Sequence, residues 1–261
     1  MFRRFAIISI LFITVAAFAQ NTLPLTADSA VLMNPMTKKL IYAKNEHKKL
    51  APASTTKIMT AIVVLRNRSL DDKVTVSKYA SSMEPSKVYI KEGEVYSVRD
   101  LLKAVLLNSG NDASVVLAEA VAGSEKDFSS MMTEVAKSIG AEDTNFRNSS
   151  GLPAKNQYST AYDLALIVRE AMKYKYFVEI MKMKKAEIEE FNSGRKIKLK
   201  NHNKSLWKDT PYSIFGKTGY TKNAGHCFAG YIRYSWWKKV IVVTLKGSKL
   251  WDDLEILAAS Y

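Results

Sequence analysis

Ser54 and Lys57 lie three positions apart, so on a helix they would share one face. Pro52 precedes them, and Ile58 and Ile62 follow at helical spacing, which predicts that a helix begins here. The hydroxyl would lie at the positive end of the helix dipole, with the amine one turn below it. An amine whose pKa is lowered by burial or by a second cation can accept a hydroxyl proton. The pair therefore predicts a serine nucleophile that needs no histidine.

The spacing alone is weak evidence, because it recurs in this lysine-rich chain. In isolation it more often marks a helix-capping serine followed by a solvated lysine. The other occurrences, which we interpret as chance, are Ser193/Lys196, Ser205/Lys208 and Ser235/Lys238.

Two further motifs strengthen the functional interpretation. Ser109-Gly110-Asn111 falls between two expected helices, and Lys217-Thr218-Gly219 falls on an expected strand. Each alone is a common turn or strand sequence. The ordered set S-x-x-K, S-x-N and K-T-G is far more specific and indicates a serine acyl-transfer site.

The elements that must position these motifs follow from hydrophobic periodicity. Strands are expected at both ends of the chain and helices between them, which predicts an α+β fold whose sheet joins the two termini. We expect one two-lobed unit. The expected elements are a hairpin at 29–45, helices at 99–107, from about 113, at 124–139 and at 160–171, a charged hairpin at 184–201, strands at 215–221, 227–234 and 239–246, and a closing helix at 251–260.

The first twenty residues have the composition of a secretory signal. Arg3 and Arg4 precede an apolar run over residues 5–18, and Ala17-Phe18-Ala19 forms an A-x-A cleavage pattern. We expect residues 1–19 to be a cleaved signal peptide and residues 20–261 to be a single catalytic domain. The location expected is extracytoplasmic, in the periplasm or the cell wall.

The chain has 261 residues and a formal net charge of +14, which favours anionic partners. Export and the lack of a nucleic-acid-binding signature argue against nucleic acid. An acidic wall polymer or a lipid surface fits better, and surface lysines that only maintain solubility are an equal alternative. Cys227 lies in an apolar stretch and is expected to be a buried, inert thiol. The three histidines lack zinc-like spacing, so neither a metal nor another cofactor is expected.

With the segments around its motifs, the chain resembles the serine penicillin-binding proteins, specifically the low-molecular-mass D-alanyl-D-alanine carboxypeptidases of peptidase family S11. The resemblance implies a β-lactamase/transpeptidase-like fold. In that fold an antiparallel sheet formed by both chain ends packs against helices, beside a helical lobe. The segments that carry it are residues 49–61, 101–119, 148–166 and 216–230.

The resemblance also implies roles for the first two motifs. Ser54 would attack the D-Ala-D-Ala carbonyl and form an acyl-enzyme, and Lys57 would accept its proton. Ser109 would relay a proton towards the leaving D-alanine nitrogen, and Asn111 would hydrogen-bond the substrate backbone. β-Lactams would act as covalent inhibitors.

The third motif would complete the site. Lys217 would add positive charge beside the catalytic amine, and Thr218 would contact the terminal carboxylate. Gly219 would let the substrate pair along the strand edge. The backbone N–H groups of Ser54 and Tyr220 would form the oxyanion hole.

The function implied is removal of the terminal D-alanine from peptidoglycan stem peptides. Three alternatives remain: a D,D-endopeptidase that cuts cross-links, a non-catalytic wall-binding protein, and a β-lactamase. The last is disfavoured because the chain lacks a Glu-x-x-Leu-Asn-type segment. The third stem residue, the oligomeric state and the physiological stage are not specified by the sequence.

The sequence departs from the family pattern at several positions. Tyr220 replaces a frequent histidine, and residues 246–253 lack the arginine that binds the substrate carboxylate in many relatives. Lys249 could replace that charge, although not as a bidentate donor. His202 stands where relatives often have arginine and is expected to be a structural residue at the groove edge.

Two expectations concern membranes. Many relatives continue into a β-rich domain and an amphipathic anchor, and neither is expected here. Trp236-Trp237-Lys238-Lys239 falls at an expected hairpin turn. A partly packed turn is favoured over a membrane contact, so membrane association is expected to be peripheral at most.

Overall fold

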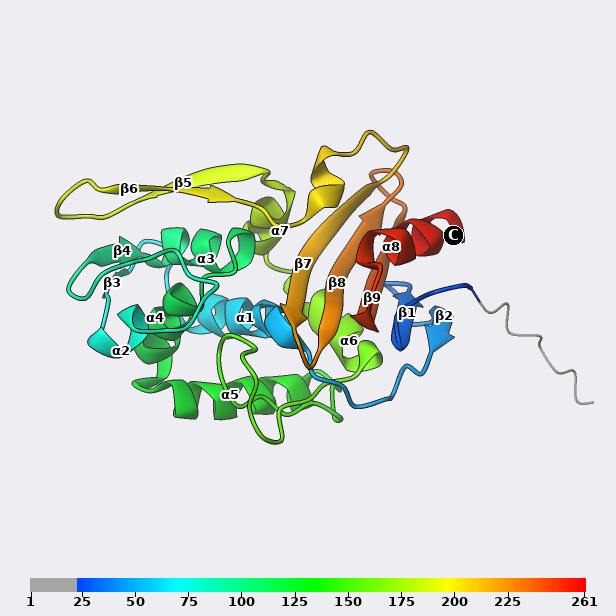
Figure 1. The fold of residues 1–261 in the computed structure, drawn as a ribbon, viewed down its shortest axis with the longest axis horizontal. Helices are drawn as coiled ribbons and strands as arrows, with labels where there is room; N and C mark the ends of the chain where they lie inside the picture. Colours follow the sequence, from blue (N-terminus) through cyan, green and yellow to red (C-terminus); the bar gives the residue numbers. More distant parts are fainter. Residues whose placement is uncertain (1–22) are drawn as a thin grey trace, which may run out of the picture.

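A computed structural model describes residues 23–261. Its main sheet has five antiparallel strands in the order β2-β1-β9-β8-β7, and β7 forms one edge. The pairing of β1 with β9 brings the two ends of the chain together, as predicted (Figure 1). The strands are β1 Ser29–Met33, β2 Leu40–Lys44, β7 Ser213–Thr221, β8 Gly225–Arg233 and β9 Lys239–Gly247.

The central strands are buried on both faces. In β1, Val31 and Met33 pack towards the helices of the larger core, whereas Ala30 and Leu32 pack towards α8 (Leu250–Ala259). β9 divides its side chains between the two cores in the same alternating way. This arrangement explains why the strands are continuous apolar runs, since a strand covered on both faces needs no polar positions.

The helices α1 to α5 form a lobe beside the main sheet, on the side of β7 (Figure 1). α5 and α6 begin at Ser124 and Thr160, whose hydroxyls accept backbone N–H bonds from Asp127 and Asp163, so the expected caps are present. The lobe and its flanks contain α1 Lys57–Asn67, α2 Lys78–Ser81, α3 Val98–Leu107, α4 Asn111–Ala122, α5 Glu125–Ser138, α6 Ala161–Ala171, α7 Lys175–Lys182 and the 3₁₀ turns η1 Ala53–Thr56 and η2 Lys204–Trp207. Two small two-stranded sheets pair β3 Lys73–Thr75 with β4 Val95–Ser97 and β5 Lys185–Glu189 with β6 Lys196–Lys200.

Two local expectations need correction. Ser54 lies in the 3₁₀ turn η1, and the α-helix begins only at Lys57. The two tryptophans in the turn between β8 and β9 are not packed: Trp236 is 80% exposed and Trp237 is 71% exposed. Neither side chain packs against either hydrophobic core.

The expected signal peptide, residues 1–19, lies outside the residues that the structure describes. From residue 23 onwards, none of the helices combines the length and the apolar character required to cross a bilayer.

Candidate active site

The junction of η1 and α1 sets the spacing of the first motif. Ser54 Oγ and Lys57 Nζ lie 3.1 Å apart, so the two side chains share a face as predicted. Ala53 is held in the left-handed region, at a φ of 47°. Gly151 packs directly on it, since a Cβ at position 151 would lie 1.9 Å from the carbonyl oxygen of Ala53. The serine is therefore presented by a constrained backbone.

Lys57 is fully buried and is surrounded by neutral acceptors. Its Nζ lies 2.7 Å from Oδ1 of Asn111 and 2.6 Å from the carbonyl oxygen of Ser150, in addition to the serine. Among residues 23–261 it forms no ion pair. A buried ammonium without a carboxylate partner is strongly disfavoured.

These three contacts match the hydrogen-bonding capacity of a neutral amine. The oxygens of Asn111 and Ser150 can only accept, so they take the two N–H donors of an uncharged Lys57. The lone pair then faces Ser54, whose O–H can donate to it. The arrangement is that of a base poised to take the serine proton.

The electrostatic surroundings act in the same direction. Burial, and secondarily the charge of Lys217, hold the pKa of Lys57 well below its usual range. The carboxylates of Asp112 and Glu125 oppose this shift without reversing it. The sequence-based expectation that Lys217 favours a neutral Lys57 agrees with this direction.

Lys217 is the second buried lysine of the site, at 1% exposure. It lies on β7, and its Nζ donates to the carbonyl oxygen of Thr218 at 2.9 Å. Burial lowers its pKa to about 7. Its charge can therefore change within the physiological range.

His202 lies within the field of both lysines. Its side chain is partly open to solvent. Burial of part of the ring and the charges of Lys217 and Lys57 lower its pKa to about 4. His202 is therefore neutral at physiological pH and does not supply the positive charge of the arginine that relatives often have at this position.

The second motif occupies the junction of α3 and α4. Ser109 has a φ of 60°, a left-handed conformation in a tight connection. Asn111 begins α4, and its amide is oriented from both ends: Oδ1 accepts from Lys57, and Nδ2 donates to the carbonyl oxygen of Glu84 at 2.8 Å. One hydrogen of that Nδ2 is left for another acceptor.

The sequence motifs assigned no role to the loop that supplies the Ser150 carbonyl. Glu125 accepts both the N–H and the hydroxyl of Ser149, at 3.0 and 2.6 Å. Thr60 donates to the carbonyl oxygen of Ser149 at 2.6 Å. The one residue in the sequence that could have indicated a special role for this loop is Gly151. Its left-handed φ of 85° and its close approach to Ala53 both require glycine.

β7 brings the third motif to the nucleophile. A Cβ at Gly219 would lie 2.9 Å from the backbone nitrogen of Ser54, so the strand passes directly over η1. Because β7 is an edge strand, its outer side is open for another chain to pair with it. Thr218 is half-buried, and Tyr220 is 62% exposed with its ring 4.7 Å from that of His226.

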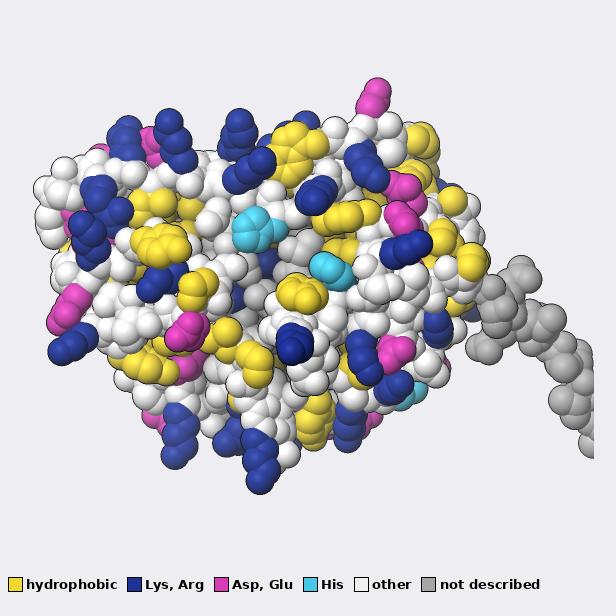
Figure 2. Space-filling view, viewed as in Figure 1, with side chains coloured by type: hydrophobic (Ala, Val, Ile, Leu, Met, Phe, Trp, Pro, Cys, Tyr) yellow, Lys and Arg dark blue, Asp and Glu magenta, His cyan; other side chains and the backbone are white. Residues whose placement is uncertain are grey.

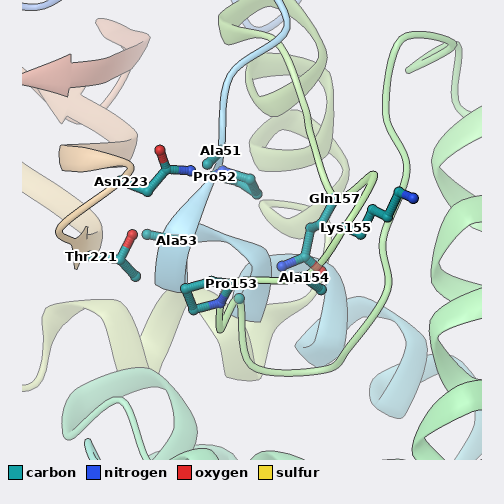
Figure 3. A pocket seen from close by; sticks show the side chains of 10 residues that line it. Ala51, Pro52, Ala53, Pro153, Ala154, Lys155, Gln157, Thr221 and Asn223 are labelled. Carbon is teal, nitrogen blue, oxygen red and sulfur yellow. The ribbon is translucent and has the colours of Figure 1, made fainter.

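The surface is hollowed between the sheet and the helical lobe (Figure 2). A pocket of about 270 Å³ adjoins the nucleophile on the side of Ala53. Figure 3 shows Thr221 and Asn223 on one side of it and Gln157 and Lys155 on the other. Ser54 does not line this pocket, but it is only half-buried and so keeps some surface open to solvent.

Other side chains are not arranged as metal ligands. From residue 23 onwards no group of three or more histidine, cysteine, aspartate or glutamate side chains could hold a metal ion. Cys227 is buried, as expected, and burial raises the pKa of its thiol to about 11, which disfavours the reactive thiolate.

Comparison with known sequences identifies relatives of most of the chain. The family profile of the D-alanyl-D-alanine carboxypeptidases (peptidase S11) matches residues 16–249. D-alanyl-D-alanine carboxypeptidase DacF of Bacillus subtilis is 39% identical over 206 residues, which are 77% of this chain and 52% of that protein. The chain thus spans about half the length of this relative.

Solved structures agree with the sequence comparison. Penicillin-binding protein 6B from Escherichia coli is similar, with a TM-score of 0.80, 32% identity and coverage of 92% of this chain and 77% of that one. A variant of the Streptomyces K15 DD-transpeptidase has a TM-score of 0.83 at 30% identity and covers 90% of this chain and 97% of that one. The expected α+β transpeptidase-like fold is confirmed, and the chain belongs to the D-alanyl-D-alanine carboxypeptidase family, peptidase family S11.

Proposed function

We propose that the protein is a serine D,D-carboxypeptidase that removes the terminal D-alanine of peptidoglycan stem peptides. One observation carries the proposal: the buried amine of Lys57 lies 3.1 Å from Ser54 Oγ, and its two other neighbours can only accept hydrogen bonds. This leaves the lone pair for the serine proton. Family membership supports the choice of substrate.

Acylation follows from this arrangement. Ser54 Oγ attacks the carbonyl carbon between the two D-alanines while its proton passes to Lys57 Nζ. The negative charge on the carbonyl oxygen is stabilised by the N–H groups of Ser54 and Tyr220. When the C–N bond breaks, the departing nitrogen takes a proton that reaches it through Ser109. The products are a free D-alanine and a serine ester.

Substrate binding uses the edge of β7. The peptide adds to this edge as an extra strand, and the remaining Nδ2 hydrogen of Asn111 donates to its backbone. Protonated Lys217 and the hydroxyl of Thr218 attract the terminal carboxylate. Gly219 keeps the strand close enough to Ser54 for this pairing. Water then hydrolyses the ester and regenerates the serine.

A carboxypeptidase of this kind acts outside the cytoplasm. The first residues have signal-peptide composition, so we propose that cleavage after Ala19 releases a catalytic domain beginning at Gln20. The proposed partners are stem peptides as substrates and β-lactams as covalent inhibitors.

Digestion of purified muropeptides tests the proposal. Uncross-linked pentapeptide and a cross-linked dimer are incubated separately with the chain that begins at Gln20, and products are read by mass spectrometry. We expect loss of one D-alanine from the pentapeptide and no such loss with Ser54→Ala. Cleavage of the dimer alone would replace the proposal with the endopeptidase alternative. Joining of stem peptides would indicate a transpeptidase, and no turnover by the folded protein would indicate a binding protein.

A further inference from the structure

We propose that the tip of the β8–β9 hairpin, residues 233–239, docks on the surface of an anionic lipid bilayer. The tip contains two adjacent tryptophans that project into solvent, Trp236 at 80% and Trp237 at 71% exposure. Their rings meet edge to face with 5.1 Å between the ring centroids, and so form one continuous aromatic surface. Tryptophan is enriched at membrane–water interfaces, where its ring is in apolar surroundings and its N–H can reach water.

The turn does not need these tryptophans for its own structure. The N–H of Tyr234 donates to the carbonyl oxygen of Lys238 at 2.9 Å, and the N–H of Lys238 donates to Ser235 Oγ at 3.0 Å. The tip is also braced from α8, since the hydroxyl of Tyr234 donates to the carbonyl oxygen of Ala258 at 2.6 Å. The aromatic pair is thus presented on a supported turn and contributes nothing visible to packing.

The charges around the tip specify an anionic surface. Residues 233–239 contain Arg233, Lys238 and Lys239 and no acidic residue. Within residues 23–261 none of these three cations pairs with an acidic side chain, and the amine of Lys238 lies over the ring of Tyr261 and 3.3 Å from its backbone oxygen. Cations that flank interfacial aromatics attract acidic headgroups. An apolar protein partner would explain the tryptophans but not the cations.

More positive charge lies beside the tip. Arg233 shares the wall of a hollow with three lysines, one of which, Lys208, pairs with Glu255. One acid, Asp209, also lines it. The net charge of the side chains that line this hollow remains positive. The three lysines are Lys182, Lys184 and Lys208.

Other exposed aromatic side chains do not form such a surface. Phe191 is 60% exposed but lies at a separate turn, with the amine of Lys73 over its ring. Tyr89, 66% exposed, is likewise covered by Lys87. These single residues provide matched controls for substitutions in the aromatic pair.

Docking through the tip leaves the active site accessible. Gly219 pairs with Cys227 on β8, whereas the tip begins at Arg233, six residues further along that strand. At the rise of a β-strand this is about 20 Å. The reactive groove would therefore stand away from the lipid and face the polymer outside it.

Vesicle co-sedimentation tests the proposal. The chain that begins at Gln20 is used, so that the apolar run at residues 5–18 cannot bind lipid itself. Vesicles contain either phosphatidylcholine alone or phosphatidylcholine with one quarter phosphatidylglycerol. We expect binding to the anionic vesicles that falls at least tenfold in Trp236→Ala/Trp237→Ala and several-fold in Lys238→Gln/Lys239→Gln. Phe191→Ala should bind like the parent chain.

Three results would overturn the proposal. One is unchanged binding of the double tryptophan variant, and another is equal binding to neutral and anionic vesicles. The third is tryptophan-dependent binding to a purified anionic wall polymer without binding to vesicles, which would assign the tip to the wall instead. All variants should retain the parent's melting temperature and its rate of penicillin labelling, since the tip lies outside the groove.

Discussion

Replacing Gly219 with alanine should slow acylation by a penicillin about a hundredfold without unfolding the protein. The added Cβ would lie 2.9 Å from the backbone nitrogen of Ser54 and 3.1 Å from Cβ of Ala53. Ordinary van der Waals contact begins at 3.4 Å, so β7 and η1 must separate by about 0.5 Å. Because the N–H groups of Ser54 and Tyr220 form the two sides of the proposed oxyanion hole, this movement spoils both donors at once.

The expected size follows from related perturbations. Loss of one oxyanion-hole donor slows catalysis roughly 10²- to 10³-fold. The backbone at Gly219 is not in the left-handed region, so its conformation accommodates alanine. The substitution therefore destabilises the fold only through overpacking by the added Cβ. Overpacking destabilises by about 1–3 kcal/mol, which lowers the melting temperature by less than about 12 °C for a chain of this size.

The assay is stopped-flow or gel-based labelling with a fluorescent penicillin, together with a thermal melt. Ser213→Ala provides the control, because it changes a small side chain at the far end of the same strand. If Gly219→Ala acylated at the parent rate while remaining folded, the groove could not be formed as described, and the oxyanion hole would have to be sought elsewhere.

Three further predictions concern the amine and the backbone around it. The rate of acylation should rise with pH as Lys57 loses its proton, and this rise should occur at a pKa well below the usual lysine range. The rate should fall above about pH 7, because Lys217 becomes neutral and no longer holds the carboxylate of the inhibitor. A rate that still climbs at pH 9 would contradict these roles. Asn111→Asp places a carboxylate 2.7 Å from Lys57 Nζ, which should raise the pKa of that amine, move the rising limb of the pH profile to higher pH and slow labelling at pH 7 at least about tenfold. Asn34→Asp, in an exposed turn, is its control, and equal labelling of the two variants would refute the neutral-base argument. Gly151→Ala should lower the melting temperature as well as labelling, because its Cβ would overlap the Ala53 carbonyl and its φ of 85° disfavours alanine; a melt like that of the parent would show that this contact is not required.

Much of the fold could be predicted because its strands and long helices have clear periodicity. The hairpin of β1 and β2, the three strands β7 to β9 and α8 were all expected within a few residues. The short pair of β3 and β4 was not, since three-residue strands such as Lys73–Thr75 carry too little alternation to detect. The helix Lys175–Lys182 was missed because charged residues interrupt its short apolar pattern.

In the active site, side-chain groups could be predicted from the sequence, whereas backbone groups could not. Motif spacing identified Ser54, Lys57 and Asn111, which the structure brings within hydrogen-bond distance of one another through the lysine. The carbonyl of Ser150 could not be found in this way, because a backbone acceptor leaves no trace in residue type. The exposure of Trp236 was misjudged for a related reason: sequence places it in a turn but does not say what covers the turn.

The most direct test of the account is covalent labelling with a penicillin, followed by intact mass and peptide mapping. We predict one adduct per chain, located on Ser54 and absent in Ser54→Ala. Its lifetime should be long enough for isolation, because the ester that penicillin forms with Ser54 is hydrolysed only slowly. An adduct on another residue, or none on a protein shown to be folded, would contradict the assignment of Ser54 and Lys57 as nucleophile and base.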